Sequence, residues 1–175
     1  MTDLVAHIRA TPWLADLLAA RFDFDVTRDD PAEQVHLASG EPLMPIAGDG
    51  AGGTFFLTPS GRVVYAGSEG QGGLIALSLR DALALVVGLP SLHDALAQPL
   101  GDDLRGWLAE IDEEIRGDDA LRPGWLALDE ARARVRQELG LPLAEGLLAG
   151  LHAAANDDAY RPISEHGPYE SMLRS

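Results

Sequence analysis

The residues with the clearest potential for chemistry form a glycine-rich run, Gly48-Asp-Gly-Ala-Gly-Gly53, which matches the phosphate-binding pattern G-x-G-x-x-G. In dinucleotide-binding proteins a helix follows this loop at once, so that its N-terminus meets the pyrophosphate. Here the residues Thr54–Leu57 follow instead, and they predict a strand. The kinase version of the loop needs a lysine on the next strand, and the chain has no lysine. We therefore interpret the run as a tight turn whose glycines adopt positive φ.

Histidines and carboxylates offer few other candidates for catalysis or metal binding. The histidines are His7, His36, His93, His152 and His166, and none has the spacing H-x-x-H or H-E-x-x-H. Two short groups, Glu165-His166 and Asp157-Asp158 near His152, fall where loops and helix ends usually carry solvated polar residues. The sequence also lacks the G-x-S-x-G motif of serine hydrolases. We expect no metal, no cofactor and no catalysis.

Acidic residues cluster on a helix predicted over residues 103–116, beside an apolar stripe that contains Trp107 and Ile111. Such a cluster is either an ordinary solvated helix face or a docking surface for a protein rich in arginine or lysine. Glycine-rich loops at 48–53 and 67–73 are further candidates for recognition. The candidate partner-binding residues are Asp49, Glu69, Gln71, Glu110, Asp112, Glu113, Glu114, Asp118 and Asp119.

The charge balance limits the kinds of partner. The chain has 28 acidic residues against 13 basic ones, all arginine, and its net charge is −15. This charge disfavours binding to nucleic acid and to anionic membranes. It would attract a basic protein, or it serves solubility alone. Without cysteine or lysine the chain can form no disulfide, thiolate metal site or Schiff base. No apolar run approaches the ~18 residues of a membrane span, and no signal peptide is evident at the start, so we expect a cytoplasmic protein.

The elements that must position these residues follow from hydrophobic periodicity. A period of two predicts four short strands near 42–47, 54–58, 62–67 and 74–77. A period of 3.6 predicts a helical pair over 3–22 and helices over 79–87, 103–116, 128–139 and 143–151. Ser78 and Asp81 form a capping box for the helix at 79–87, and Gly88 followed by Pro90 should end it. Gly117 should end the helix that begins near 103.

These elements predict an α+β fold, in which a small antiparallel sheet of about four strands with flanking helices precedes a helical C-terminal half. The length of 175 residues suits one well-buried core. We predict an α+β core over 1–98 and a helical extension over 99–175 that packs on it, or one domain over 1–175.

The central segment resembles the SUKH superfamily, which contains fungal cell-wall-synthesis regulators and many bacterial immunity proteins. The matching stretches are Leu43–Gly50, Gly52–Leu57, Gly61–Tyr65, Ile75–Leu79 and Ala82–Val86. The resemblance implies an α+β fold without catalytic residues that binds a protein toxin delivered between competing cells. The family commonly has an aromatic residue where Leu79 stands, and the segment after residue 98 lies outside the resemblance.

The leading hypothesis is therefore a cytoplasmic, non-catalytic immunity-type protein that neutralises a basic protein toxin by occlusion. The first alternative is a small-molecule-binding protein or enzyme with a pocket between the sheet and the C-terminal helices. The second is a regulatory or scaffold protein, for which an exposed apolar patch on a C-terminal helix would argue.

Overall fold

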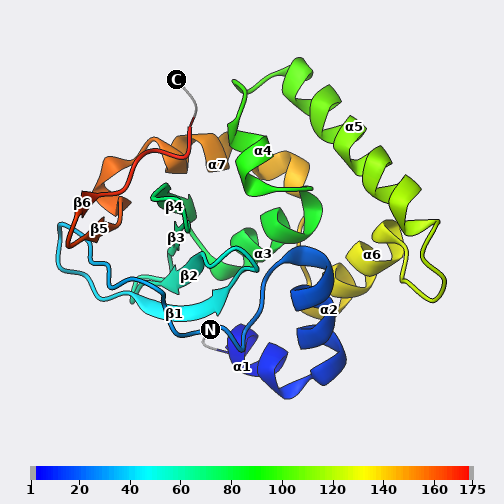
Figure 1. The fold of residues 1–175 in the computed structure, drawn as a ribbon, viewed down its shortest axis with the longest axis horizontal. Helices are drawn as coiled ribbons and strands as arrows, with labels where there is room; N and C mark the ends of the chain where they lie inside the picture. The colour runs from blue at the N-terminus through cyan, green and yellow to red at the C-terminus, as the bar shows by residue number, and fades with distance from the viewer. Residues whose placement is uncertain (1–2, 174–175) are drawn as a thin grey trace.

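The computed structural model describes residues 3–173 and has the predicted α+β class (Figure 1). The helices are α1 (Asp3–Ala10), α2 (Pro12–Phe22), α3 (Leu79–Gly88), α4 (Leu92–Leu96), α5 (Asp102–Asp119), α6 (Leu128–Leu139) and α7 (Leu148–Ala155). The strands are β1 (Met44–Gly48), β2 (Thr54–Leu57), β3 (Val63–Ala66), β4 (Gly72–Ala76), β5 (Ile163–Ser164) and β6 (Gly167–Pro168), and the 3₁₀ turns are η1 (Ala144–Leu147) and η2 (Asp158–Tyr160).

The main sheet is an antiparallel meander in the order β1-β2-β3-β4, and both of its faces are covered. Phe55 and Tyr65 belong to the large apolar cluster that also contains helical residues. Their neighbours Phe56 and Val64 belong to a smaller cluster on the other face, with Tyr169 from the C-terminal segment. Alternate residues of each strand therefore enter different cores, which is why the strands are apolar at nearly every position.

Helix α3 is the central helix of the larger core, and its two ends are built differently. Its start is capped as predicted, because Ser78 Oγ accepts a hydrogen bond from the Asp81 N–H at 3.1 Å. Its end differs from the prediction, since Gly88 is helical and Leu89 is an extended cap residue. A Cβ on Gly88 would lie 2.4 Å from the Cβ of Ala144. The glycine therefore allows η1 to approach the helix and does not supply a left-handed turn.

The predicted core segment and the predicted helical extension share a single hydrophobic cluster. It runs from Val5 to Met172 and includes Leu83 of α3, Leu104 of α5 and Val135 of α6. Within the described residues, no helix combines the length and apolar character needed to cross a bilayer.

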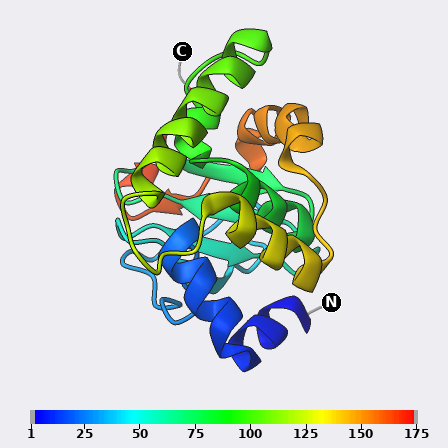
Figure 2. The same ribbon diagram turned by 90° about the vertical axis from the view of Figure 1, so that its right-hand side faces the viewer.

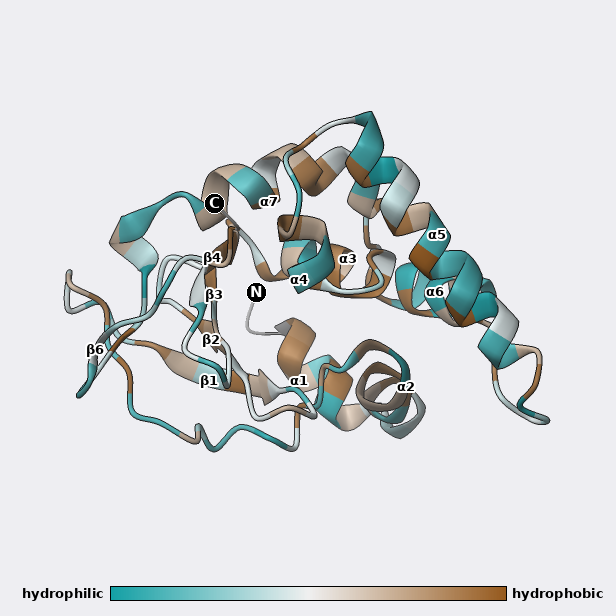
Figure 3. Cartoon of the chain, turned by 45° about the horizontal axis from the view of Figure 1, so that its top comes forward, coloured by the Kyte–Doolittle hydropathy of each residue, from teal (hydrophilic) through white to brown (hydrophobic). Residues whose placement is uncertain are grey.

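Helix α5 lies along the outside of the molecule (Figures 1 and 2). It continues two residues beyond Gly117, where the sequence predicted its end, because Asp119 is buried and bonded to Arg21 of α2. Leu104 and Leu108 are its buried apolar residues, and hydrophilic residues dominate the rest of the helix (Figure 3). The helix is thus attached to the body along one narrow side.

Candidate functional site

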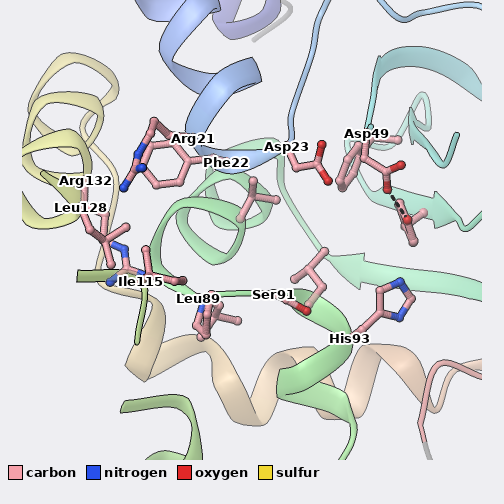
Figure 4. A pocket seen from close by; sticks show the side chains of 15 residues that line it. Arg21, Phe22, Asp23, Asp49, Leu89, Ser91, His93, Ile115, Leu128 and Arg132 are labelled. Atoms are coloured by element: carbon pink, nitrogen blue, oxygen red, sulfur yellow. Dashed lines mark hydrogen bonds between the residues drawn. The ribbon is translucent and has the colours of Figure 1, made fainter. Parts of the chain in front are cut away.

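A cleft of about 350 Å³ lies where the end of α2, one end of the sheet, the α3–α4 segment, α5 and α6 meet (Figure 4). Its lining residues are Arg21, Phe22, Asp23, Asp49, Phe55, Tyr65, Val86, Leu89, Pro90, Ser91, Leu92, His93, Ile115, Leu128 and Arg132. Asp23, Asp49 and His93 lie toward one end of the cleft, and Arg21, Leu128 and Arg132 lie toward the other (Figure 4). We call the first the acidic end.

Asp49 organises the β1–β2 turn at the acidic end. The residue is 8 % exposed, and its Oδ1 accepts hydrogen bonds from the main-chain N–H groups of Ala51 at 3.0 Å and Gly53 at 2.8 Å. The Tyr65 hydroxyl donates to Oδ2 of the same carboxylate. Burial, the bond to Asp49 and the charges of Asp49 and Asp23 together hold the pKa of Tyr65 far above its usual value. Tyr65 therefore stays a neutral donor at physiological pH.

The glycine run that contains Asp49 is a turn between two strands, as predicted. Its glycines mainly allow neighbouring groups to lie closer to the main chain than a side chain would permit. Gly52 is the one glycine of the run with a positive φ, at +100°. A Cβ on Gly53 would lie 2.4 Å from the Tyr65 hydroxyl oxygen, and one on Gly48 would lie 2.8 Å from Arg28 Cβ. The loop precedes a strand and has no helix N-terminus behind it, so it lacks the feature that holds a nucleotide phosphate.

Asp23 is the second carboxylate of the acidic end and caps the C-terminus of α2. Its backbone is left-handed, with φ 54° and ψ 37°, and among residues 3–173 no other non-glycine residue has a positive φ. Aspartate tolerates this conformation better than most residues. The Asp23 Oδ1 accepts a hydrogen bond from the Gly50 N–H at 2.7 Å, which joins the end of α2 to the β1–β2 turn. The carboxylate is thereby held beside the cleft.

Two buried ion pairs occupy the other end. Arg21 Nη1 donates to Asp119 Oδ1 at 2.8 Å, and this bond lowers the pKa of Asp119 below its usual value. Arg132 donates through Nη1 and Nη2 to both carboxylate oxygens of Asp112 at 2.9 Å, and through Nε to the Val87 carbonyl at 2.8 Å. Both guanidinium groups are therefore neutralised by α5, and the charge left at the cleft is negative.

The structure separates the nine candidate residues into groups with different surroundings. Asp112 and Asp119 are bonded within the molecule, and Asp49 lies in the cleft. Gln71 is half-buried and bridges to Glu170, whereas Glu69 is exposed in the same loop. The exposed candidates on α5 are Glu110, Glu113, Glu114 and Asp118, of which Glu113 is paired with Arg116.

Sequence reasoning did not single out the remaining polar residues of the cleft. One feature of the sequence could have indicated Asp23: it follows the apolar stripe of α2 directly, at the position where a glycine cap is common. No feature of the sequence indicates His93, Arg21 or Arg132, since each reaches the cleft through contacts between distant segments. In the described part of the chain, no three His, Asp or Glu side chains are grouped so that they could hold a metal ion.

No protein-family model, curated protein or solved structure matches this chain. The resemblance to the SUKH superfamily therefore stays a prediction made from the central segment, and the site is interpreted from its own chemistry.

Proposed function

We propose that the protein is a non-catalytic binding module for a basic protein, which it neutralises by covering the partner's active surface. The observation that carries the proposal is the acidity of α5 on its outer side. After Asp112 and Asp119 are bonded to arginines, Glu110, Glu114 and Asp118 are exposed carboxylates without an ion-pair partner in residues 3–173. The same helix reaches the cleft through Ile115, and the unpaired charges of the cleft are also negative.

The net charge of −15 extends this local field over the whole molecule. A field of one sign raises the rate at which an oppositely charged protein is encountered and excludes partners of the wrong charge. A basic toxin of the kind bound by SUKH immunity proteins would have the complementary surface, and the resemblance of the segment 43–86 favours this class of partner. A cytoplasmic location would suit such a protein.

The polar groups of the cleft favour binding over catalysis. The Ser91 Oγ accepts a hydrogen bond from the Asp94 N–H at 3.0 Å and caps α4. Asp49 and Tyr65 are bonded to each other, and burial and Asp49 hold Tyr65 in its neutral form. A nucleophile requires a base within hydrogen-bond reach, and no such bond joins Ser91 to His93 in the described residues.

The decisive experiment begins with capture of partners from lysate of the native cells by the tagged protein at low and high salt. A basic protein that is released by salt is then purified, and its association rate is measured with two variants. The first variant, Glu110→Gln/Glu113→Gln/Glu114→Gln/Asp118→Asn, neutralises the outer side of α5. The control, Asp29→Asn/Asp30→Asn/Glu165→Gln/Glu170→Gln, removes four exposed charges from other segments.

We expect the α5 variant to associate about tenfold more slowly at low ionic strength, and the control to change the rate much less. The difference should shrink at high salt, because exposed charges are screened. Equal rates for the two variants, or capture of no basic protein at either salt, would contradict the proposal.

A second candidate function rests on the cleft itself, whose volume falls near the lower limit for ligand pockets. A small cationic molecule bound at the acidic end would make the protein a ligand-binding protein. Thermal-shift screening with cationic and neutral compounds separates this function from the first, because only a ligand that binds the folded state raises the melting temperature.

A further inference from the structure

We propose that the cleft beside α5 receives an arginine side chain of the basic partner, with the guanidinium group at the acidic end. This inference rests on the proposed function and names the group that the partner would insert.

The charges select a cation. Asp23 and Asp49 carry two negative charges at one end, and no arginine or histidine within the described residues forms an ion pair with either carboxylate. Arg28 lies close to this end, but its Nη1 donates to the main-chain carbonyl of Asp49 at 3.2 Å, and its Nε faces Asp25 at 3.4 Å. An anion would meet two carboxylates here, whereas a cation would be attracted by both.

The hydrogen bonds of the two carboxylates leave room for a donor. Asp23 is exposed and receives one hydrogen bond, at Oδ1, so its Oδ2 is free to accept another. Each carboxylate oxygen has two acceptor sites, and Asp49 receives two bonds at Oδ1 and one at Oδ2. A guanidinium group presents five N–H donors in one plane and can serve two carboxylates at once, which the compact ammonium of lysine does less well.

The remaining walls suit the stem of the side chain. Phe22, Leu89, Leu92 and Ile115 also line the cleft and supply apolar surface. The methylene stem of an arginine would contact this surface while its charged group remains at the carboxylates. A volume of about 350 Å³ accommodates one side chain and excludes a folded segment.

The probe is N-acetyl-arginine methyl ester, titrated into the ¹⁵N-labelled full chain at pH 8. We expect amide shifts at Gly50, Gly53 and Leu92 with an apparent Kd on the order of 1 mM. The citrulline ester has the same shape without the charge and should leave these amides unmoved. The lysine ester should bind more weakly than the arginine ester.

Asp23→Asn is the informative variant, because asparagine keeps the acceptor for the Gly50 N–H and tolerates the left-handed backbone. It should weaken binding of the arginine ester at least about tenfold. Asp16→Asn removes the same charge from an exposed position of α2 that does not line the cleft, and it should leave the Kd nearly unchanged. Equal effects of the two variants on the Kd would mean that the ester is attracted only by the overall negative charge of the protein, and this would overturn the inference.

Three further results would also overturn the inference: no shifts at the cleft amides, equal shifts with the citrulline ester, or butylguanidinium binding more than tenfold tighter than the ester. The last would assign the cleft to a free small molecule. If the arginine ester does not bind at the cleft but the α5 variant associates more slowly with the partner, the proposed function is still supported. Binding of the arginine ester at the cleft, together with an unchanged association rate of the α5 variant, would contradict only the docking role of α5.

Discussion

At the scale of single residues, the bond between Tyr65 and Asp49 joins the sheet to the loop at the cleft. Both residues are buried, and the phenol is one of three donors to the carboxylate. Asp23 serves the same loop from α2 through Gly50. The geometry of the acidic end thus depends on a few hydrogen bonds, and Tyr65→Phe removes one of them.

Tyr65→Phe should lower the free energy of unfolding by about 1–3 kcal/mol, because it leaves a buried carboxylate oxygen without its donor. Urea denaturation of the variant and the unmodified chain measures the difference. Tyr160→Phe is the matched control, since Tyr160 is half-buried and its hydroxyl forms no hydrogen bond within residues 3–173. Similar losses for both variants would show that the Tyr65 hydroxyl has no special role.

At the scale of elements, α5 is attached through the buried residues Leu104 and Leu108, and Trp107 and Ile115 pack on the same core in partly buried positions. Buried ion pairs join it to α2 and α6. Arg132 joins three helices, since it belongs to α6 and binds Asp112 of α5 and, in the last turn of α3, the Val87 carbonyl. Its side chain is 6 % exposed and that of Asp112 is 16 % exposed. Removal of one member of such a pair leaves the other charge poorly solvated.

Arg132→Met should therefore lower the free energy of unfolding by about 3–5 kcal/mol. The double variant Asp112→Leu/Arg132→Met removes both charges and should recover a large part of that loss, as measured by denaturant titration. Arg134→Met is the control, because Arg134 is exposed and paired only with Glu130 on its own helix. A double variant no more stable than Arg132→Met would argue against the ion pair as the attachment of α5.

At the scale of the whole molecule, the excess of acidic residues opposes folding while it favours encounter with a basic partner. Like charges at the surface repel one another more in the compact state than in the unfolded chain. The two buried ion pairs of α5 are screened less by salt than exposed charges are.

Raising the sodium chloride concentration from about 0.01 M to about 0.5 M should therefore raise the melting temperature, because the Debye length falls well below the spacing of surface charges. Scanning calorimetry at pH 7 measures the change. The charge-reduced quadruple variant of α5 should show a smaller rise than the unmodified chain. A melting temperature that falls over this range would mean that favourable ion pairs outweigh the surface repulsion.

The sequence by itself determined the elements, because hydrophobic period and caps act over a few residues. The four strands of the main sheet and helices α1, α2, α3, α5 and α6 overlap the ranges that the periodicity of two and of 3.6 predicted, and Ser78 caps α3 as expected. The helix predicted over 143–151 is instead the 3₁₀ turn η1 followed by α7, and the β5–β6 pair was not predicted. The fold class and the acidic character of α5 follow from the same local information.

Only the tertiary structure decided which charges are free and where the cleft lies. The pairing of Arg21 with Asp119 joins residues 98 positions apart, and that of Arg132 with Asp112 joins residues 20 positions apart. No local pattern records such contacts, so the sequence could not separate Asp112 and Asp119 from the exposed carboxylates beside them. For the same reason Asp23 and Asp49, 26 positions apart, became one site only through the packing of α2 against the β1–β2 turn.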